Sequence, residues 1–283
     1  MPQVAPVERV RRRFEGAAGK QLAARLPTGY QRLGDAVVLR LPAVLEEWSH
    51  ALGKIYLEEF GATMVFTIDG IGKGFRRTPK VRLIGGEGGE VTVRDGGCAW
   101  TFDPSRIMFS AGNMEERHRM ANIVEAGETL VDLFAGIGYF SLPMALTGKP
   151  SRIYSVDKNP VAYSYLVKNV WQNRVGKTVT AILGDNRVSA LPEARADRIL
   201  LGYLPSSLPY VRRALPLLRP EGGWLHVHTV VSVRGRKKTE TALQEVLRRS
   251  GRSLERLGKH RVKSYGPSRE HVVLDVRVGP GDP

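Results

Sequence analysis

Cysteine is almost absent from this sequence of 283 residues, in which Cys98 is the single example. One cysteine excludes a disulfide within the chain, and it excludes a zinc cluster built from several cysteines. The scarcity of cysteine fits a reducing compartment, and we therefore expect a cytoplasmic protein.

Long hydrophobic runs are also missing. No segment approaches the roughly 18 to 20 consecutive apolar residues that a transmembrane helix requires, and no apolar run follows the arginines near the N-terminus as it would in a secretory signal. We therefore expect no association with a membrane. Hydrophobic residues still make up 42% of the chain, which is enough to build the core of one large domain or of two modest ones.

Acidic residues are few in comparison with basic ones. The chain has 28 Asp and Glu against 43 Lys and Arg, a formal net charge of +15. Such an excess attracts a polyanion, and contacts with phosphates supply much of the affinity of proteins for nucleic acids. A solvated, thermophile-like surface is the alternative, but surfaces of that kind usually balance their charges. We therefore predict a nucleic-acid partner.

One stretch organises the rest of the chain: residues 131–140, which read VDLFAGIGYF. The pattern predicts a short buried strand, a tight turn through Gly136 and Gly138, and the start of a helix. A strand that leads through glycines into a helix N-terminus is typical of a cofactor site on a doubly wound α/β sheet. Taken alone, the same pattern also fits an ordinary strand-to-helix turn.

A second strand, at 153–157, ends in Asp157. Asp157 follows the glycines by about twenty residues in the sequence. Nucleotide-binding folds carry an acidic residue at this separation, where it binds the ribose hydroxyls. The turn is Asp-x-Phe-x-Gly-x-Gly and lacks the Gly-x-Gly-x-x-Gly that cradles a pyrophosphate. The combination therefore indicates S-adenosylmethionine in preference to NAD.

The patterns before and after this region differ, and they predict two domains. Before it we expect a strand at 37–41, an amphipathic helix at 43–60 closed by Gly61, and strands at 64–68, 80–84, 90–94 and 98–102. After it, strands and helices alternate, with strands at 179–183, 198–203, 223–231 and 271–278. We therefore predict a smaller α+β domain at 1–112 and a Rossmann-like α/β domain at 113–283.

Three basic segments are candidates for contact with nucleic acid. The first is Arg9 with Arg11–Arg13, in a region at 1–35 that we expect to be a partly mobile arm or a frayed terminus. The second is the glycine-rich loop at 70–80, which is basic and carries one aromatic residue. The third is the run at 234–238.

Several polar residues outside the glycine turn are candidate ligands. Ser110 or Asn113 is placed to cap the helix that begins the second domain. Arg117 in that helix is placed to hold a carboxylate, and a methionine carboxylate is a natural target; a salt bridge on the helix surface is the alternative. Asp185 and Asn186 follow the strand at 179–183, at the edge where open α/β sheets bind ligands.

Two histidines, His226 and His228, point to the same side of the strand at 223–231. A metal pair is conceivable there. No third ligand lies nearby in the sequence, so we interpret them as polar groups on a half-buried strand and predict no metal site.

Five ordered motifs resemble the class I S-adenosylmethionine-dependent methyltransferase fold. More narrowly, they resemble the tRNA family that contains the guanine-N1 methyltransferases and their sister enzymes of wybutosine biosynthesis. The motifs lie at 108–117, 131–140, 157–160, 169–173 and 184–187. The resemblance extends over residues 60–275.

The end of the fourth strand separates the two branches of this family. The methyltransferases carry Asn-x-Pro there, and their Asn helps to position the target guanine. This chain has GYLPSS at 202–207, which resembles the aminocarboxypropyl-transferring enzymes. The resemblance implies an archaeal-type enzyme that transfers the 3-amino-3-carboxypropyl group of S-adenosylmethionine to 4-demethylwyosine, next to the anticodon of tRNA-Phe. A tRNA guanine-N1 methyltransferase and a non-catalytic RNA-binding protein are the alternatives.

The same resemblance implies roles for individual residues. The co-substrate's amino-acid part would contact Ser110 and Arg117, its ribose Asp157, and its adenine Asp185 and Asn186. Phe134 and Gly136 would form the surrounding wall, and Tyr203 and Pro205 would position the reacting groups. No general base is assigned, and the sequence does not predict the oligomeric state.

Overall fold

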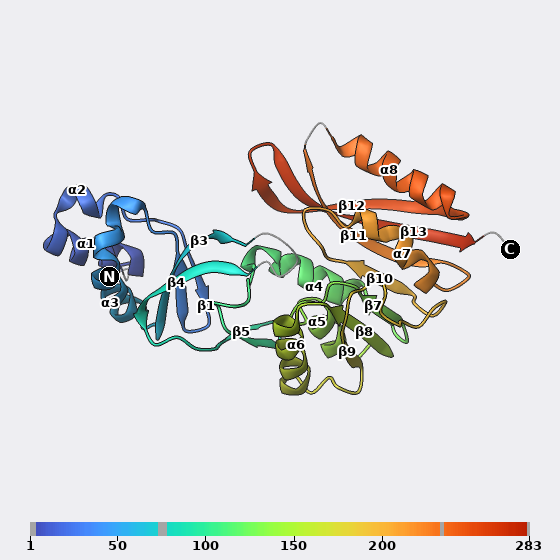
Figure 1. Cartoon of the computed structure of the whole chain (residues 1–283), viewed down its shortest axis with the longest axis horizontal. Helices are drawn as coiled ribbons and strands as arrows, with labels where there is room; N and C mark the ends of the chain where they lie inside the picture. The colour runs from blue at the N-terminus through green and yellow to red at the C-terminus, as the bar shows by residue number, and fades with distance from the viewer. Residues whose placement is uncertain (1–3, 73–77, 233–234, 282–283) are drawn as a thin grey trace. The chain divides into compact units, whose positions relative to one another are not determined.

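The structure, a computed structural model, describes residues 4–72, 78–232 and 235–281 (Figure 1). The chain divides into two compact units. The first consists of Met1–Arg94 with Ala99–Ala111, and the second of Asp95–Cys98 with Gly112–Pro283. None of the helices in the described ranges combines the length and the hydrophobicity of a transmembrane segment.

The first unit is built on a four-stranded sheet with the order β1-β2-β3-β4, in which β2 and β3 are parallel and the other neighbours antiparallel. The strands are β1 (Tyr30–Leu33), β2 (Ala36–Leu39), β3 (Met64–Ile71) and β4 (Pro79–Gly86). The helices are α1 (Pro6–Ala18), α2 (Lys20–Ala23), the 3-10 helix η1 (Ala43–Trp48) and α3 (Ser49–Phe60). A separate hairpin of β5 (Val91–Asp95) and β6 (Cys98–Phe102) follows.

The N-terminal region does not form the mobile arm that we predicted. It folds as α1, whose Val10 and Phe14 are completely buried in the core of the first unit. Arg9 forms an ion pair with Glu59 at 2.8 Å, and Arg13 forms another with Glu58. The segment contains apolar residues at helical spacing as well as the arginines, and these form the buried face of α1. The acidic partners of Arg9 and Arg13 lie in the same unit. The centre of the basic 70–80 loop, residues 73–77, lies outside the described residues.

The second unit is a seven-stranded sheet with the order β12-β13-β11-β10-β7-β8-β9. Strands β7 to β11 are parallel, and β13 and β12 complete the sheet in antiparallel fashion. The strands are β7 (Thr129–Asp132), β8 (Arg152–Asp157), β9 (Val179–Leu183), β10 (Arg198–Leu201), β11 (Gly223–Ser232), β12 (Arg252–Gly266) and β13 (Arg269–Gly281). The helices are α4 (Met114–Ile123), α5 (Ser141–Leu146), α6 (Pro160–Gln172), α7 (Val211–Ala214) and α8 (Arg236–Arg249). This is the predicted doubly wound α/β arrangement.

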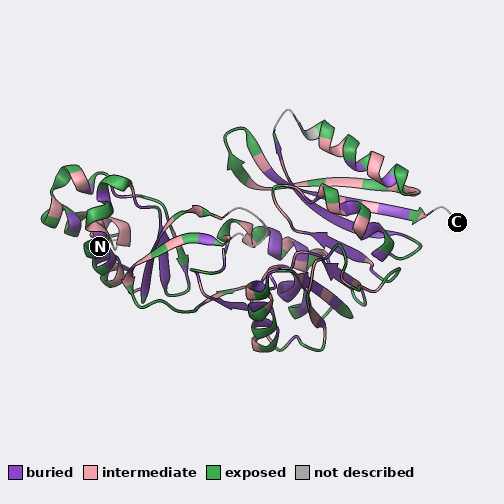
Figure 2. Ribbon diagram, in the orientation of Figure 1, coloured by how far each residue is buried: buried purple, intermediate pink, exposed green. Residues whose placement is uncertain are grey.

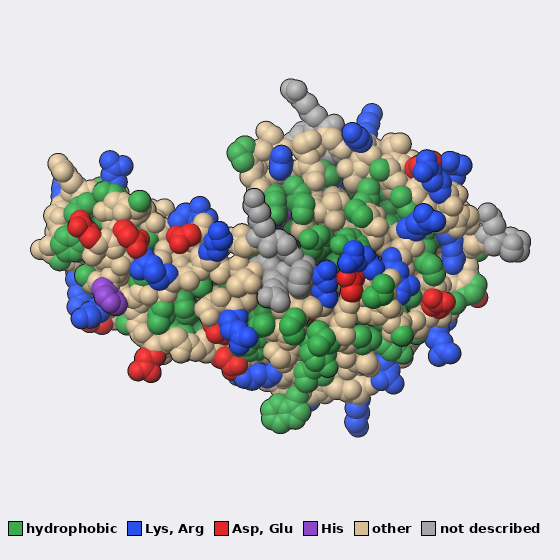
Figure 3. Space-filling view, in the orientation of Figure 1, with side chains coloured by type: hydrophobic (Ala, Val, Ile, Leu, Met, Phe, Trp, Pro, Cys, Tyr) green, Lys and Arg blue, Asp and Glu red, His purple; other side chains and the backbone are tan. Residues whose placement is uncertain are grey.

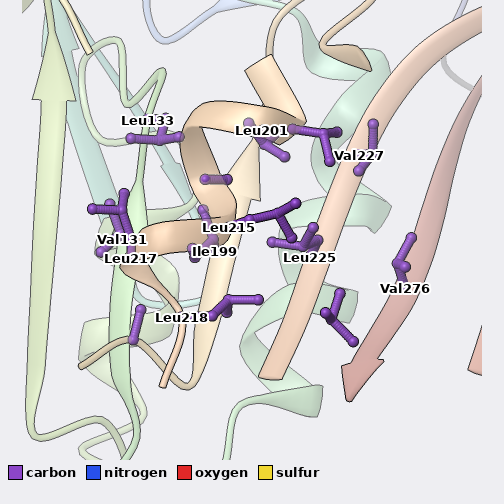
Figure 4. Packing of buried hydrophobic residues seen from close by; sticks show 14 of the residues in the cluster. Val131, Leu133, Ile199, Leu201, Leu215, Leu217, Leu218, Leu225, Val227 and Val276 are labelled. Carbon is purple, nitrogen blue, oxygen red and sulfur yellow. The ribbon is translucent and has the colours of Figure 1, made fainter. Parts of the chain in front are cut away.

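The parallel strands bury side chains on both faces, as Figure 2 shows for the centre of this sheet. On one face Val131, Ile199 and Leu225 pack with residues of α7 and α8 (Figure 4). On the opposite face Asp132 forms a hydrogen bond with Ser141 of α5. Burial on both sides makes the carboxyl ends of these strands a rigid support for the turns that follow them.

Candidate active site

The turn after β7 requires glycine at two positions. Gly136 and Gly138 have φ angles of 58° and 91°, in the left-handed region. A Cβ atom at Gly138 would lie 2.6 Å from Cγ of Leu142, and one at Gly136 would lie 2.4 Å from a ring carbon of Tyr139. Backbone conformation and close packing therefore both exclude larger residues at these two positions.

Asp157, at the end of β8, fastens this turn. Its Oδ2 accepts a hydrogen bond from the amide of Gly136 at 2.8 Å, and its Oδ1 accepts one from the amide of Asn159 at 2.8 Å. Burial raises the pKa of the carboxyl group, while the two amides act in the opposite direction. Each carboxylate oxygen can accept a second hydrogen bond, so Asp157 keeps the capacity to bind a ribose hydroxyl.

Asp132 holds the other side of the turn, although the sequence analysis gave it no role. Its carboxylate is fully buried and accepts hydrogen bonds from the Phe134 amide at 3.2 Å and from Oγ of Ser141 at 2.9 Å. Ser155 in turn donates to Ser141 at 2.7 Å. Burial raises the pKa of Asp132 to about 7. An acid that ends a buried strand was the available signal, but its partners are evident only in three dimensions.

The raised pKa of Asp132 predicts a pH dependence of stability. The folded state retains a proton up to about pH 7, whereas an unfolded Asp loses it near pH 3.8. The contribution of Asp132 to the free energy of unfolding should therefore be fully present below pH 3.8, and it should be lost as the pH rises towards 7. Asp132→Asn, which keeps an acceptor for the Phe134 amide, should flatten this dependence in urea denaturation at pH 5 and pH 8. Equal pH dependence in the two proteins would contradict the assignment.

Three aromatic rings gather beside the turn. Phe134 stacks on Tyr203, with 5.2 Å between ring centroids, and meets Tyr210 edge-on at 4.8 Å. Phe134 follows β7 and Tyr203 follows β10, which are neighbouring parallel strands. The predicted wall residue Phe134 and the predicted positioning residue Tyr203 are thus in direct contact.

Asn186 and Asp185 occupy different environments despite their adjacency. The side-chain amide of Asn186 is buried and donates to the carbonyl of Leu133 at 2.8 Å, while its Oδ1 is buried and has no hydrogen-bond partner among the residues that the structure describes. The carboxylate of Asp185 faces the surface, where it accepts from Nε of Arg187 at 2.9 Å and lies 3.5 Å from Nζ of Lys158. The hydrogen bonds from Arg187 hold the pKa of Asp185 well below its usual range.

Arg117 of α4 is also part of this region. Its guanidinium lies over the Tyr139 ring at 4.9 Å, and the side chain is 2% exposed. Burial lowers its pKa to about 10, so the group remains charged at neutral pH. Asn113 stands at the N-cap of α4 but makes no side-chain capping bond among the described residues, so the prediction is wrong for Asn113. Ser110 directly precedes the 3-10 helix η2 (Ala111–Asn113) that leads into α4. Ser110 itself lies in the first unit.

The segment after β10 is attached to β11. Oγ of Ser207 is buried within hydrogen-bond distance of the carbonyl oxygens of Leu201 and, at 2.6 Å, of His228, and it can donate its proton to either. The carbonyl of Pro205 accepts from the Val230 amide at 2.7 Å. A Cβ atom at Gly202 would lie 3.5 Å from the Phe140 ring, an ordinary contact.

The two histidines of β11 are buried, so the predicted half-buried strand is wrong. Nδ1 of His226 lies 2.6 Å from Asp275, and Nδ1 of His228 lies 3.0 Å from Nε2 of His271. Burial lowers the pKa of both β11 histidines. Within the described ranges, no three His, Cys, Asp or Glu residues are grouped as metal ligands.

His226 belongs to a buried network that the sequence analysis missed. Arg198 donates to both oxygens of Glu128, at 2.9 and 2.8 Å, and lies 2.8 Å from Nε2 of His226. Asp275 links His226 to Arg119, which also pairs with Glu116. The network lines a cleft of about 250 Å³ near the amino ends of β10 and β11. Its charged groups satisfy one another, so it is a structural element away from the glycine turn.

Comparison with known proteins identifies relatives over nearly the whole chain. The TRM5/TYW2 methyltransferase domain matches residues 91–255, and the TYW2 N-terminal domain matches residues 10–89. A tRNA(Phe) (4-demethylwyosine(37)-C(7)) aminocarboxypropyltransferase of Pyrococcus horikoshii is 33% identical over 95% of this chain and 96% of its own length. The crystal structure of P. horikoshii TYW2 in complex with MeSAdo has a TM-score of 0.86 at 31% identity, covering 96% of this chain and 99% of that one.

A plant relative shows the same region within a longer protein. The tRNA wybutosine-synthesizing protein 2/3/4 of Arabidopsis thaliana is 36% identical over 91% of this chain. The matched region spans 27% of the length of that relative.

Proposed function

Since this chain belongs to the TYW2 branch of the TRM5/TYW2 family, we propose that it transfers the 3-amino-3-carboxypropyl group of S-adenosylmethionine to C7 of 4-demethylwyosine in tRNA-Phe. The observation that carries the proposal is the glycine turn fastened by Asp157, with the unpartnered Oδ1 of Asn186 beside it. The enzyme of P. horikoshii that is named for this reaction matches the chain over almost its full length.

The residues of the turn fit the nucleoside part of S-adenosylmethionine. Asp157 has lone pairs left for the ribose hydroxyls, and its hydrogen bond with the Gly136 amide holds the glycine turn beside it. The buried Oδ1 of Asn186 is an acceptor that an adenine amine would satisfy, which removes the cost of an unpaired polar atom. Asp185 is a weaker candidate because Arg187 and Lys158 already engage it.

The methionine part requires a cation for its carboxylate and a polar group for its amine. We assign the carboxylate to Arg117, because a buried guanidinium forms strong charge-assisted hydrogen bonds. Ser110 is assigned to the same part of the co-substrate on the family resemblance. Phe134 forms the wall of the site through its stack with Tyr203.

The positively charged sulfonium sulfur of S-adenosylmethionine makes each of its three attached carbons electrophilic, so a nucleophile can attack any of them. The residues of the site decide which carbon faces the base, and such positioning contributes several kcal/mol without a strong acid or base. Ring carbon C7 would form the new bond, the bond from sulfur to the aminocarboxypropyl group would break, and methylthioadenosine would leave. The ring would then lose a proton to an acceptor that we do not assign.

Tyr203 and Pro205 are the residues that we propose for positioning. Tyr203 is fixed against Phe134 and Tyr210, and the Pro205 carbonyl is bonded to β11. The methyltransferases that this chain resembles carry Asn-x-Pro here, and their asparagine, which helps to position the guanine, corresponds to Tyr203 when their proline corresponds to Pro205. The absence of that asparagine favours the aminocarboxypropyl branch.

The family of the chain and its excess of basic residues both indicate a tRNA partner. We propose that the substrate is tRNA-Phe, bound at its anticodon region, and that the protein works in the cytoplasm. The excess of basic residues favours RNA binding, and the first unit and the 70–80 and 234–238 segments are candidates for the contact. The P. horikoshii relative that is named for this reaction is archaeal, so we propose an archaeal-type enzyme.

A two-label transfer assay tests the proposed function. The protein is incubated with tRNA-Phe that carries 4-demethylwyosine and with S-adenosylmethionine labelled either on the methyl group or on the carboxyl carbon. We expect the carboxyl label alone to enter tRNA, with methylthioadenosine as the by-product. Entry of the methyl label alone would identify a methyltransferase, and binding of tRNA without transfer of either label would support a non-catalytic RNA-binding protein.

A further inference from the structure

The outer surface of α6 carries a tryptophan that the fold does not use. Trp171 is 82% exposed, although tryptophan is highly buried on average. Val167, one turn earlier on the same face of the helix, is 44% exposed. Figure 3 shows hydrophobic side chains gathered over α6 with Lys and Arg side chains around them. The patch is thus apolar at its centre and basic at its margin.

The segment of the chain that carries α6 is rich in basic residues. Residues 133–184 contain six basic residues (Lys149, Arg152, Lys158, Lys168, Arg174 and Lys177) and a single acidic one, Asp157. Asp157 is turned into the glycine turn, and Lys158 is paired with Asp185. Across the described ranges, Arg152, Arg174 and Lys177 take part in no salt bridge. Arg174 and Lys177, both exposed, therefore offer cations that no acidic residue of the described ranges neutralises.

We propose that the surface formed by Val167, Trp171, Arg174 and Lys177 is a docking site for an unpaired nucleotide of the tRNA substrate. An exposed indole is a platform on which a base can stack, and adjacent cations hold the phosphates on either side. A second copy of the chain is disfavoured as the occupant, because pairing two such surfaces would bring like charges together.

The position of the patch suits a substrate whose reacting base lies at the glycine turn. Helix α6 starts three residues after Asp157, and Trp171 is its twelfth residue, about 16 Å along the helix axis from its start. A short length of single strand that leaves the reacting base can follow α6 over this distance. The surface would thus act as a second point of attachment, separate from the site of chemistry.

This inference rests on the proposed function, because it takes tRNA as the substrate. The test measures the Kd for tRNA-Phe of the full chain as wild type, Trp171→Ala and Trp171→Phe. Fluorescently labelled tRNA-Phe reports binding, and unlabelled tRNA-Phe competes with it. We expect the alanine variant to bind tRNA at least about fivefold more weakly, since one stacked base contributes roughly 1–3 kcal/mol. The phenylalanine variant keeps an aromatic face and should stay within about twofold of the wild type.

The affinity for S-adenosylmethionine, measured alongside, should be the same in all three proteins. Equal tRNA affinity of the wild type and Trp171→Ala would overturn the docking site while leaving the proposed function intact. A wild-type dimer in light scattering that Trp171→Ala converts to monomers would also overturn it in favour of a second copy. A wild type that binds no tRNA would instead remove both the docking site and the proposed function.

Discussion

Replacing Arg198 with methionine is expected to lower the free energy of unfolding of the second unit by about 3–5 kcal/mol. Arg198 is 3% exposed and holds both oxygens of Glu128. Its removal would leave the buried Glu128 charge uncompensated and Nε2 of His226 without its donor. Methionine fills a similar volume, so loss of charge pairing and not loss of packing should dominate.

Chemical denaturation followed by circular dichroism measures this effect, and Arg219→Met is a suitable control. Arg219 also pairs with an aspartate, Asp197, at 2.7 Å, but the two side chains are 47% and 26% exposed. Exposed pairs contribute only about 0–1 kcal/mol. A loss of stability at Arg198 no greater than that at Arg219 would show that the buried network is not required for the fold.

Asp157→Ala is expected to weaken binding of S-adenosylmethionine by about 1.5–3 kcal/mol, or roughly 10- to 150-fold in Kd. The variant loses the proposed acceptor for the ribose hydroxyls. It also leaves the amides of Gly136 and Asn159 without their partner, so the turn loses its anchor. Isothermal titration calorimetry measures the change in affinity.

A control for Asp157 is available in Asp103. Its Oδ1 accepts a hydrogen bond from the amide two residues later, Ser105, at 2.8 Å, as Asp157 does from Asn159. Asp103→Ala should therefore remove a similar local bond without affecting the affinity for the co-substrate. If Asp157→Ala bound S-adenosylmethionine as tightly as the wild type, the ribose assignment would be wrong.

The glycine turn and Asp157 could be predicted from sequence because each depends on residues that are close together in the chain. The turn needs glycines at fixed places after a strand, and the acid needs only the end of the next strand. Asn186 was predicted for the same reason. Its bond to the carbonyl of Leu133, however, joins residues 53 positions apart, and no local pattern reveals it.

The errors of the sequence analysis have physical causes as well. The prediction of a partly mobile arm or frayed terminus at 1–35 is wrong for α1. Four arginines lie between the apolar residues Val10 and Phe14 and their neighbours, so the apolar face of the helix is not evident from the sequence. β12 was missed because it is an edge strand with a mostly exposed, charged sequence and several register shifts, so it lacks the apolar alternation of a buried strand. The network around Arg198 joins residues from α4, β10, β11 and β13, which only the folded sheet brings together.

The place of β13 in the sheet affects how the protein can be synthesised. β13 is the last strand in the sequence, yet it lies between β11 and β12 and supplies Asp275 to the buried network. Chains leave the ribosome from the N-terminus. In a nascent chain that has not yet reached residues 269–281, the segment with the glycine turn has already been synthesised. One edge of the valine-rich β11 is then still unpaired, because β13 is its neighbour. Until β13 is added, that edge is open to pairing with other chains.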